Sequence, residues 1–358
     1  MIIELSDVNI EAFFHYASVQ ITGFCNMNCK HCRAKDEPQV YMDIALFNKI
    51  LDFIDANREN DDFQITISGG EPLLHPNLIQ LLKSVKKRNI NYVFITTNGY
   101  FITEKLLTNI DELNIKNIWL YVSMDSVTES KHDEFRRFKG AYKKAWQNIK
   151  LIKQHNSNII VAIRMTVTRD TLFEMEDMVE LCLKNGVKHI EFQAVVPFGT
   201  ATENSDLVLT SKEKTTFLNT IAYLKNKYEG TALIMSECPQ KVAVPNSPWK
   251  YEENILDEKN YFSGCTAGID YFNIGADGIV TPCATLDEAI FNFHDVKNVE
   301  EMTDIYTKSP VVKNLLERKF KGNCGKCKLY RACGGCRAMA KALTGDYLGE
   351  DSSCEFCV

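Results

Sequence analysis

Three cysteines near the N-terminus have the spacing of a metal site. Cys25, Cys29 and Cys32 lie in the stretch GFCNMNCKHCRA, residues 23–34, at the spacing C-x3-C-x2-C. Thiolates bind iron–sulfur clusters, zinc and copper(I). A structural zinc site takes four ligands, commonly from two close pairs, whereas this stretch offers three. Three thiolates suit a [4Fe–4S] cluster that is held through three irons and leaves its fourth iron open to a substrate or cofactor.

Glycine-rich or polar segments follow the next three β-like stretches of the chain. They are SGGEP at 68–72, TTNG at 96–99 and SMDS at 123–126. In sheets of parallel strands, ligands gather at the carboxyl ends of the strands. The first cysteine stretch and these three segments would all lie there. Their succession therefore predicts one binding site at this edge of the sheet.

The elements that must position these residues are six β-like runs alternating with helical patterns. The runs cover residues 18–22, 63–68, 91–97, 117–124, 158–167 and 189–196. The helical patterns include 42–57 and 174–186, and Gly186 is expected as a C-terminal cap. Strands rich in Val, Ile and Phe indicate a parallel sheet covered by helices. Six units are too few for a closed eight-stranded barrel, so we expect an α/β fold with a partial (βα)6 barrel or an open sheet.

Composition limits the kind of partner. The chain has 358 residues, 13 cysteines and a formal net charge of −6. A broad nucleic-acid surface would favour the opposite sign. The N-terminal stretch lacks the basic and apolar regions of a signal peptide, and no run of 18 apolar residues is present to span a membrane. A cytoplasmic location is expected, where cysteines serve as metal ligands more often than as disulfides.

A second group of cysteines follows near the C-terminus. Its members are Cys265, Cys283, Cys324, Cys327, Cys333, Cys336, Cys354 and Cys357. Gly278 suits the turn of a hairpin between 271–274 and 279–283. The two C-x2-C pairs alone would also fit zinc ribbons. The additional Cys265 and Cys283 make zinc ribbons the weaker interpretation.

The N-terminal motifs resemble the radical S-adenosylmethionine superfamily. The resemblance rests on the C-x3-C-x2-C stretch with His31 before its last cysteine, and on GGEP at 69–72. It implies that a [4Fe–4S] cluster on Cys25, Cys29 and Cys32 binds S-adenosylmethionine through its open iron. An electron, supplied by a flavodoxin- or ferredoxin-type donor, then cleaves the sulfonium to a 5′-deoxyadenosyl radical. This radical takes a hydrogen atom from the substrate.

The same resemblance implies residues that contact the amino end of the cofactor. The backbone of Gly69 and Gly70 would approach the methionine amino group, and Glu71 would accept a charge-assisted hydrogen bond from it. His31 is expected among the cofactor-binding residues.

Further cofactor contacts are implied on the following strands. Ser123 and Asp125 match the positions that hold the ribose hydroxyls, and Asn98 is expected beside them. Arg164 lies in an apolar run and would be costly to bury alone, so it pairs either with the cofactor carboxylate or with another side chain. The backbone near Val195 is expected to meet the adenine.

The C-terminal cysteines resemble the SPASM domain that many radical S-adenosylmethionine enzymes carry. The resemblance implies two auxiliary [4Fe–4S] clusters, the first on Cys265, Cys283 and Cys336, and the second on Cys324, Cys327, Cys333 and Cys354. The last internal spacing, CGGC, is one residue shorter than the usual form, and Cys357 is additional. The fourth ligand of the first auxiliary cluster is therefore open, a residue other than cysteine, or Cys357.

We expect three regions: a radical S-adenosylmethionine core at 1–200, a bridging helix and loop at 201–260, and the SPASM domain at 261–358. Cys182 is expected in the core of a helix. Cys238 lies in the bridge and is either a passive thiol or a hydrogen-atom donor to a substrate radical, as in some peptide epimerases.

Three substrate classes fit the resemblance. The first is a ribosomally made peptide that receives a thioether or carbon–carbon crosslink or is epimerised. Cys25 comes too early for the leader-binding domain of many such enzymes, so either a separate recognition protein is needed or the substrate binds elsewhere. The others are a haem precursor (a tetrapyrrole whose propionate is decarboxylated) and a sugar. The segment at 132–146 resembles a stretch found in relatives that act on peptides and tetrapyrroles. The alternative interpretation is a solvated amphipathic helix. An iron–sulfur electron carrier would not need GGEP or Asp125.

Overall fold

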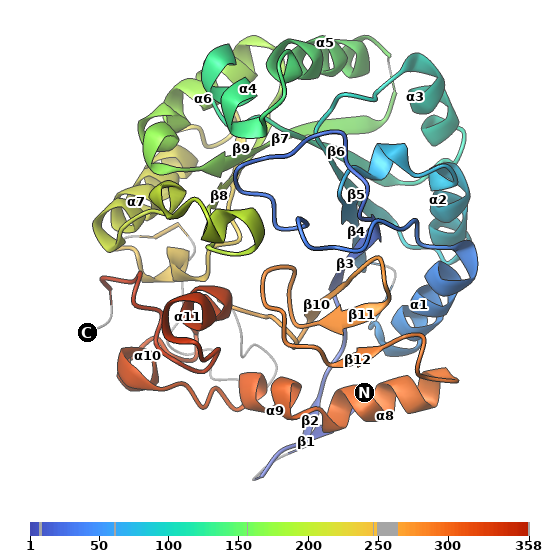
Figure 1. Ribbon diagram of the computed structural model, residues 1–358, viewed down its shortest axis with the longest axis vertical. Coiled ribbons are helices and arrows are strands. Elements are labelled where there is room, and N and C mark those ends of the chain that lie inside the picture. Colours follow the sequence, from blue (N-terminus) through green and yellow to red (C-terminus); the bar gives the residue numbers. More distant parts are fainter. Residues whose placement is uncertain (7–8, 61, 156, 246, 249–263, 357–358) are drawn as a thin grey trace.

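The computed structural model describes residues 1–6, 9–60, 62–155, 157–245, 247–248 and 264–356. Its centre is a ten-stranded sheet in the order β12-β11-β10-β3-β4-β5-β6-β7-β8-β9 (Figure 1). The strands of this sheet are β3 (Tyr16–Thr22), β4 (Gln64–Gly69), β5 (Tyr92–Thr97), β6 (Asn117–Ser123), β7 (Ile159–Val167), β8 (His189–Ala194), β9 (Leu233–Met235), β10 (Tyr271–Ile274), β11 (Ile279–Thr281) and β12 (Phe291–Asn292). The strands β1 (Ile2–Glu4) and β2 (Asn9–Glu11) form a separate antiparallel pair.

Strands β3 to β8 pair in parallel and in sequence order, which confirms the six predicted strands and the α/β class. They curve around a common centre, with helices on the outside (Figure 1). This arrangement brings the carboxyl ends of all six strands to one side. The segments after β3, β4, β5 and β6 therefore meet there, as the sequence predicts.

The helices of the first two-thirds of the chain cover the outer face of this sheet (Figure 1). They are α1 (Ile44–Asn57), α2 (Leu78–Lys87), α3 (Glu104–Asp111), α4 (Glu129–Arg136), α5 (Ala141–Gln154), α6 (Met175–Lys184) and α7 (Ser211–Lys227). The predicted helices at 42–57 and 174–186 correspond to α1 and α6. The side chain of Asp43 caps α1 by accepting from the Leu46 amide, and Gly186 follows α6 with φ +74°, as expected for a C-terminal cap.

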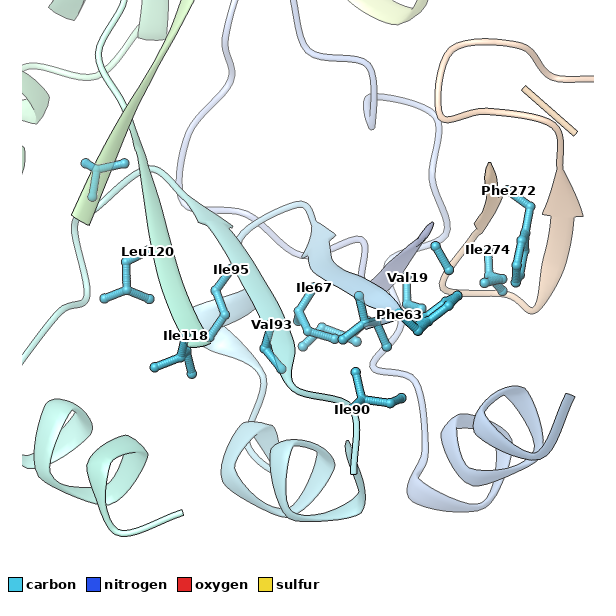
Figure 2. Close-up of a cluster of buried hydrophobic side chains, with 14 of the residues drawn as sticks. Val19, Phe63, Ile67, Ile90, Val93, Ile95, Ile118, Leu120, Phe272 and Ile274 are labelled. Atoms are coloured by element: carbon cyan, nitrogen blue, oxygen red, sulfur yellow. The ribbon is translucent and has the colours of Figure 1, made fainter. Parts of the chain in front are cut away.

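The core lies between the sheet and these helices. Val19, Ile67, Ile95 and Leu120, from four neighbouring strands, are fully buried, and the cluster continues to Phe272 of β10 (Figure 2). Burying an aliphatic or aromatic side chain of this size contributes roughly 1.5–3 kcal/mol. The continuous apolar layer therefore fixes the register of the strands that carry the site.

The regions after residue 200 extend this sheet. Strand β9 pairs in parallel with β8, and β10 pairs in parallel with β3. The predicted hairpin is confirmed, since β10 pairs antiparallel with β11 and Gly278 has φ +81° at its turn. The remaining helices are α8 (Val299–Lys308), α9 (Pro310–Leu316), α10 (Gly322–Lys326) and α11 (Arg337–Thr344). The expected bridge and C-terminal region thus both contribute strands to the sheet of the core.

Among the described residues we find no helix whose length and hydrophobicity would let it cross a lipid bilayer. Cys357 and part of the expected bridge, residues 249–260, lie outside the described residues.

Candidate active site

A cavity of about 560 Å³ lies at the carboxyl ends of the strands. Cysteines from both ends of the chain line it: Cys25, Cys29, Cys32, Cys265, Cys283 and Cys336. The first three are the N-terminal group, and the others are the set predicted for the first auxiliary cluster. The fold therefore places two sets of cysteines that are more than 200 residues apart around one space.

The two glycines of GGEP allow the cysteine loop to pack on the end of β4. Gly69 has φ +137°, and a Cβ added there would lie far inside van der Waals contact with the Thr22 carbonyl oxygen. The Gly70 amide donates to that same oxygen at 2.7 Å, and a Cβ on Gly70 would overlap the Phe24 carbonyl. Both glycines line the cavity. Close packing against the backbone of the cysteine loop thus requires glycine at both positions. The approach of the cofactor is the only reason for these glycines that the sequence indicates.

Glu71 joins two strand ends. Its side chain is fully buried and accepts hydrogen bonds from Thr97 Oγ1 at 2.7 Å, from the Asn98 amide at 2.7 Å and from the Leu73 amide at 3.0 Å. Burial raises the pKa of this carboxyl despite these bonds. Glu71 is not among the cavity-lining residues. These bonds hold the carboxylate between the ends of β4 and β5, and its contact with the amino group of the cofactor stays a prediction.

Asp125 belongs to a buried charged network behind the first cysteine group. It is 1% exposed and accepts from Arg136 Nε at 2.6 Å and from the Thr166 amide at 3.1 Å. Burial acts to raise the pKa of Asp125, but the Arg136 guanidinium and two nearby histidines outweigh it and lower the pKa. Of the two predicted ribose contacts, Ser123 lines the cavity and Asp125 does not.

Arg136 is a site residue that sequence analysis did not single out. It lines the cavity, and its Nη1 lies 3.8 Å from Cys29 Sγ. It also holds Asp125, so one guanidinium connects a cysteine of the first group to the end of β6. The sequence feature that could have indicated Arg136 is its position in the 132–146 segment, which forms parts of α4 and α5.

His132 in the same network predicts acid sensitivity. Its ring is 1% exposed and accepts from the Asp125 amide at 3.1 Å. Burial is the main reason why the pKa of His132 falls from 6.5 to about 4. Below pH 6.5 the His132 side chain therefore binds a proton in the unfolded chain but stays neutral in the folded chain. The neutral, buried His132 does not reduce the free energy of unfolding above pH 6.5, and this free energy decreases as the pH falls towards 4.

We expect the free energy of unfolding to drop by about 2 kcal/mol between pH 7 and pH 5 through His132 alone. Urea denaturation of the wild type and of His132→Asn measures it. Asn keeps an acceptor for the Asp125 amide but does not titrate, so the variant should lose less stability on acidification. Equal losses in both proteins would contradict this assignment.

Arg164 is paired within the chain. Its Nη2 lies 3.1 Å from Glu191 Oε1 and 3.1 Å from Glu237 Oε2, and the side chain lines the cavity. The sequence left open whether Arg164 pairs with the cofactor carboxylate or with a side chain of the protein, and the structure shows side-chain partners. A cofactor carboxylate would have to compete with two glutamates for this guanidinium.

The other predicted cofactor residues line the cavity. The His31 ring stacks in parallel on Phe135 at 4.3 Å, and burial lowers the pKa of His31 to about 3, so the ring is neutral. Asn98 Nδ2 donates to Asn26 Oδ1 at 2.8 Å. Val195 follows β8 and also faces the cavity. All three therefore lie where a bound cofactor could reach them.

The remaining C-terminal cysteines surround a second, small cavity of about 20 Å³. Its cysteines are Cys324, Cys327, Cys333 and Cys354. The structure thus separates the two sets that the resemblance assigned to two auxiliary clusters. In the described part of the chain, no three His, Cys, Asp or Glu side chains are close enough to hold a single metal ion. The assignment therefore rests on which cavity each cysteine lines.

Cys238 has a charged neighbour. Its Sγ lies 3.1 Å from Lys214 Nζ, both residues line the large cavity, and both are more than nine-tenths buried. Burial acts to lower the pKa of Lys214. The nearby Cys238 sulfur acts in the opposite direction and outweighs burial, so the pKa of Lys214 is raised. Cys182 is fully buried in the hydrophobic core on α6, as expected.

Comparisons with known proteins find a family model and several relatives. Residues 19–182 match the Radical SAM superfamily. An AdoMet-dependent heme synthase of Oleidesulfovibrio alaskensis is 27% identical over 94% of this chain and 86% of its own length. The antilisterial bacteriocin subtilosin biosynthesis protein AlbA of Bacillus subtilis is 27% identical over 90% of this chain and 66% of its own length.

Solved structures share the fold. Streptococcus suis SuiB bound to S-adenosylmethionine superposes with a TM-score of 0.76 at 16% identity, covering 97% of this chain and 78% of SuiB. Native anSMEcpe with bound AdoMet and a peptide gives 0.70 at 19% identity, covering 95% and 94%. Both are SPASM-type radical SAM enzymes. A radical SAM domain implies S-adenosylmethionine and a [4Fe–4S] cluster as cofactors. The parallel sheet, the cysteine-lined cavity at its carboxyl edge and these similarities together show that the protein is an enzyme that carries a radical SAM domain and is similar to SPASM-type radical SAM enzymes.

Proposed function

We propose that the protein modifies a ribosomally synthesised peptide, by forming a thioether or carbon–carbon crosslink or by epimerisation. Cys25, Cys29 and Cys32 hold the [4Fe–4S] cluster. When bound, the reduced cluster and S-adenosylmethionine supply a 5′-deoxyadenosyl radical that removes a hydrogen atom from the peptide. Gly69 and Gly70 bring the backbone next to the cofactor.

The observation that carries this proposal is the shared cavity. The N-terminal cysteines line it together with Cys265, Cys283 and Cys336. A peptide side chain held between the two groups faces both. Forming a crosslink after hydrogen abstraction leaves one electron to be removed. The three C-terminal cysteines would hold a first auxiliary [4Fe–4S] cluster, and the cysteines of the small cavity a second, and such clusters would supply one-electron acceptors close to the substrate.

The names of two relatives also support a peptide substrate. They are the subtilosin protein AlbA and a PqqA peptide cyclase of Gluconobacter oxydans, the latter 24% identical over 94% of this chain.

A haem precursor is the second candidate. AdoMet-dependent heme synthases from three organisms are 25–27% identical to this chain, each over 94% of its length. The cavity also carries the cations Arg33, Lys214 and Lys241, which could face propionate groups. In this case the same radical would start the oxidative decarboxylation of a propionate.

The other components follow from the chemistry. A flavodoxin- or ferredoxin-type protein supplies the electron. Thirteen cysteines and oxygen-sensitive clusters fit a reducing, cytoplasmic setting. In the epimerisation branch Cys238, in the cavity wall, would give a hydrogen atom to the peptide radical. The thiyl radical left on Cys238 would take up one electron from the flavodoxin- or ferredoxin-type donor and one proton from solvent.

The test is co-expression of the protein with the short open reading frames that neighbour its gene, followed by mass spectrometry of the peptides. A crosslink removes two hydrogen atoms, and epimerisation in deuterated water adds one deuterium. A parallel anaerobic assay offers a propionate-bearing iron porphyrin and measures carbon dioxide. Peptide modification supports the proposal, whereas decarboxylation with unmodified peptides would replace it with the second candidate.

A further inference from the structure

Arg337 is a buried cation without a carboxylate partner. It is the first residue of α11, and its side chain is 1% exposed. Its Nη1 donates to the carbonyl oxygens of Tyr347 at 3.0 Å and Gly349 at 2.8 Å, and its guanidinium lies 4.1 Å from the centre of the Phe320 ring. Within the described part of the chain it forms no ion pair, and its Nε has no hydrogen-bond partner. Arg337 helps to lower the pKa of the nearby Asp346 carboxyl, but a buried charge that forms no direct ion pair is still costly.

The guanidinium lies between the two sets of C-terminal cysteines. Arg337 directly follows Cys336 and lines the large cavity. Its Nη2 lies 3.5 Å from Sγ of Cys324, which lines the small cavity. Gly335, with φ +60°, leaves room for this contact, since a Cβ there would come within 2.7 Å of Arg337 Nη2 and 3.2 Å of Cys324 Sγ.

We propose that Arg337 is the counter-charge of the auxiliary clusters and raises the reduction potential of the cluster on Cys324. This inference rests on the auxiliary clusters of the proposed function. Thiolate-bound clusters carry negative charge, which offsets the cost of the buried guanidinium. Hydrogen bonds to cluster sulfurs and nearby cations favour the reduced form. The contact with Cys324 therefore draws the substrate's electron away from the large cavity, towards the buried cluster.

The experiment compares reduction potentials. Wild type, Arg337→Gln and Arg337→Lys are reconstituted anaerobically, iron is counted, and an electron paramagnetic resonance titration gives the potential of each cluster. Lys328→Gln is the matched control, because it removes the same charge next to Cys327 on an exposed side chain, where solvent screens it. We expect the reduction potential of the cluster on Cys324 to become more negative in Arg337→Gln. The same potential should stay close to the wild-type value in Arg337→Lys and change little in Lys328→Gln.

The outcomes separate this inference from the proposed function. About 12 iron atoms per wild-type chain are expected for three clusters, and about four would refute the auxiliary clusters themselves. With the iron in place, equal potentials in Arg337→Gln and Lys328→Gln would overturn the role of Arg337. Loss of iron in Arg337→Gln but not in Arg337→Lys would support the proposal, because it would show that cluster binding needs a positive charge at position 337. Loss in both would show a purely structural role and overturn the inference.

Discussion

Replacement of Cys25, Cys29 and Cys32 together by Ala should abolish the formation of 5′-deoxyadenosine from S-adenosylmethionine. These are the N-terminal thiols that line the cavity, and without them no cluster can bind the cofactor there. Anaerobic reconstitution with dithionite and S-adenosylmethionine, followed by chromatography, measures the product. Because the C-terminal cysteines remain, iron content should fall by about one-third rather than to zero.

Cys182→Ala is the control for the loss of a thiol. Cys182 is buried in the core away from both cavities, so this variant should keep its iron and its activity. Product formation by the triple variant would show that the radical chemistry starts elsewhere in the chain.

Gly69→Ala should destabilise the protein by at least about 3 kcal/mol. The substitution forces alanine to φ +137° and drives its Cβ into the Thr22 carbonyl at the end of β3. The cysteine loop begins directly after that strand, so cofactor cleavage should be lost as well. Urea denaturation followed by tryptophan fluorescence measures the change in the free energy of unfolding.

Gly230→Ala separates the two causes. Gly230 has φ +74°, and a Cβ there meets nothing within 4 Å. This variant puts alanine at a positive φ that is less strained than that of Gly69, without the clash, and should lose about 1 kcal/mol. If both variants lost the same stability, the close packing of the cysteine loop on β4 would not be the reason for glycine at position 69.

Local sequence patterns predicted most of the scaffold. The strands are short apolar runs, and their order follows from the preference of βα units for neighbouring parallel strands. The cavity cysteines were also visible, since their spacing alone indicates ligands. Strand β9 was missed because its three residues carry too little pattern, and the joining of β10 to β3 depends on contacts across 250 residues.

The partners of buried charges could not be predicted in the same way. Arg164 was visible as a cation in an apolar run, but Glu191 and Glu237 come from later elements. Glu71 was visible in a motif, but its bonds to Thr97 and Asn98 exist only once β4 and β5 are adjacent. A sequence shows which charged groups need partners, and the fold decides which groups supply them.

The parallel pairing of β10 with β3 has a consequence for dissecting the protein. Strand β3 is almost entirely buried, and Cys25 lies three residues beyond its end. A fragment ending before β10 would leave one hydrogen-bonding edge of β3 open, a template for pairing with other chains. The C-terminal quarter is therefore not a detachable module: without it, the strand that presents the first cysteines would become a surface for aggregation.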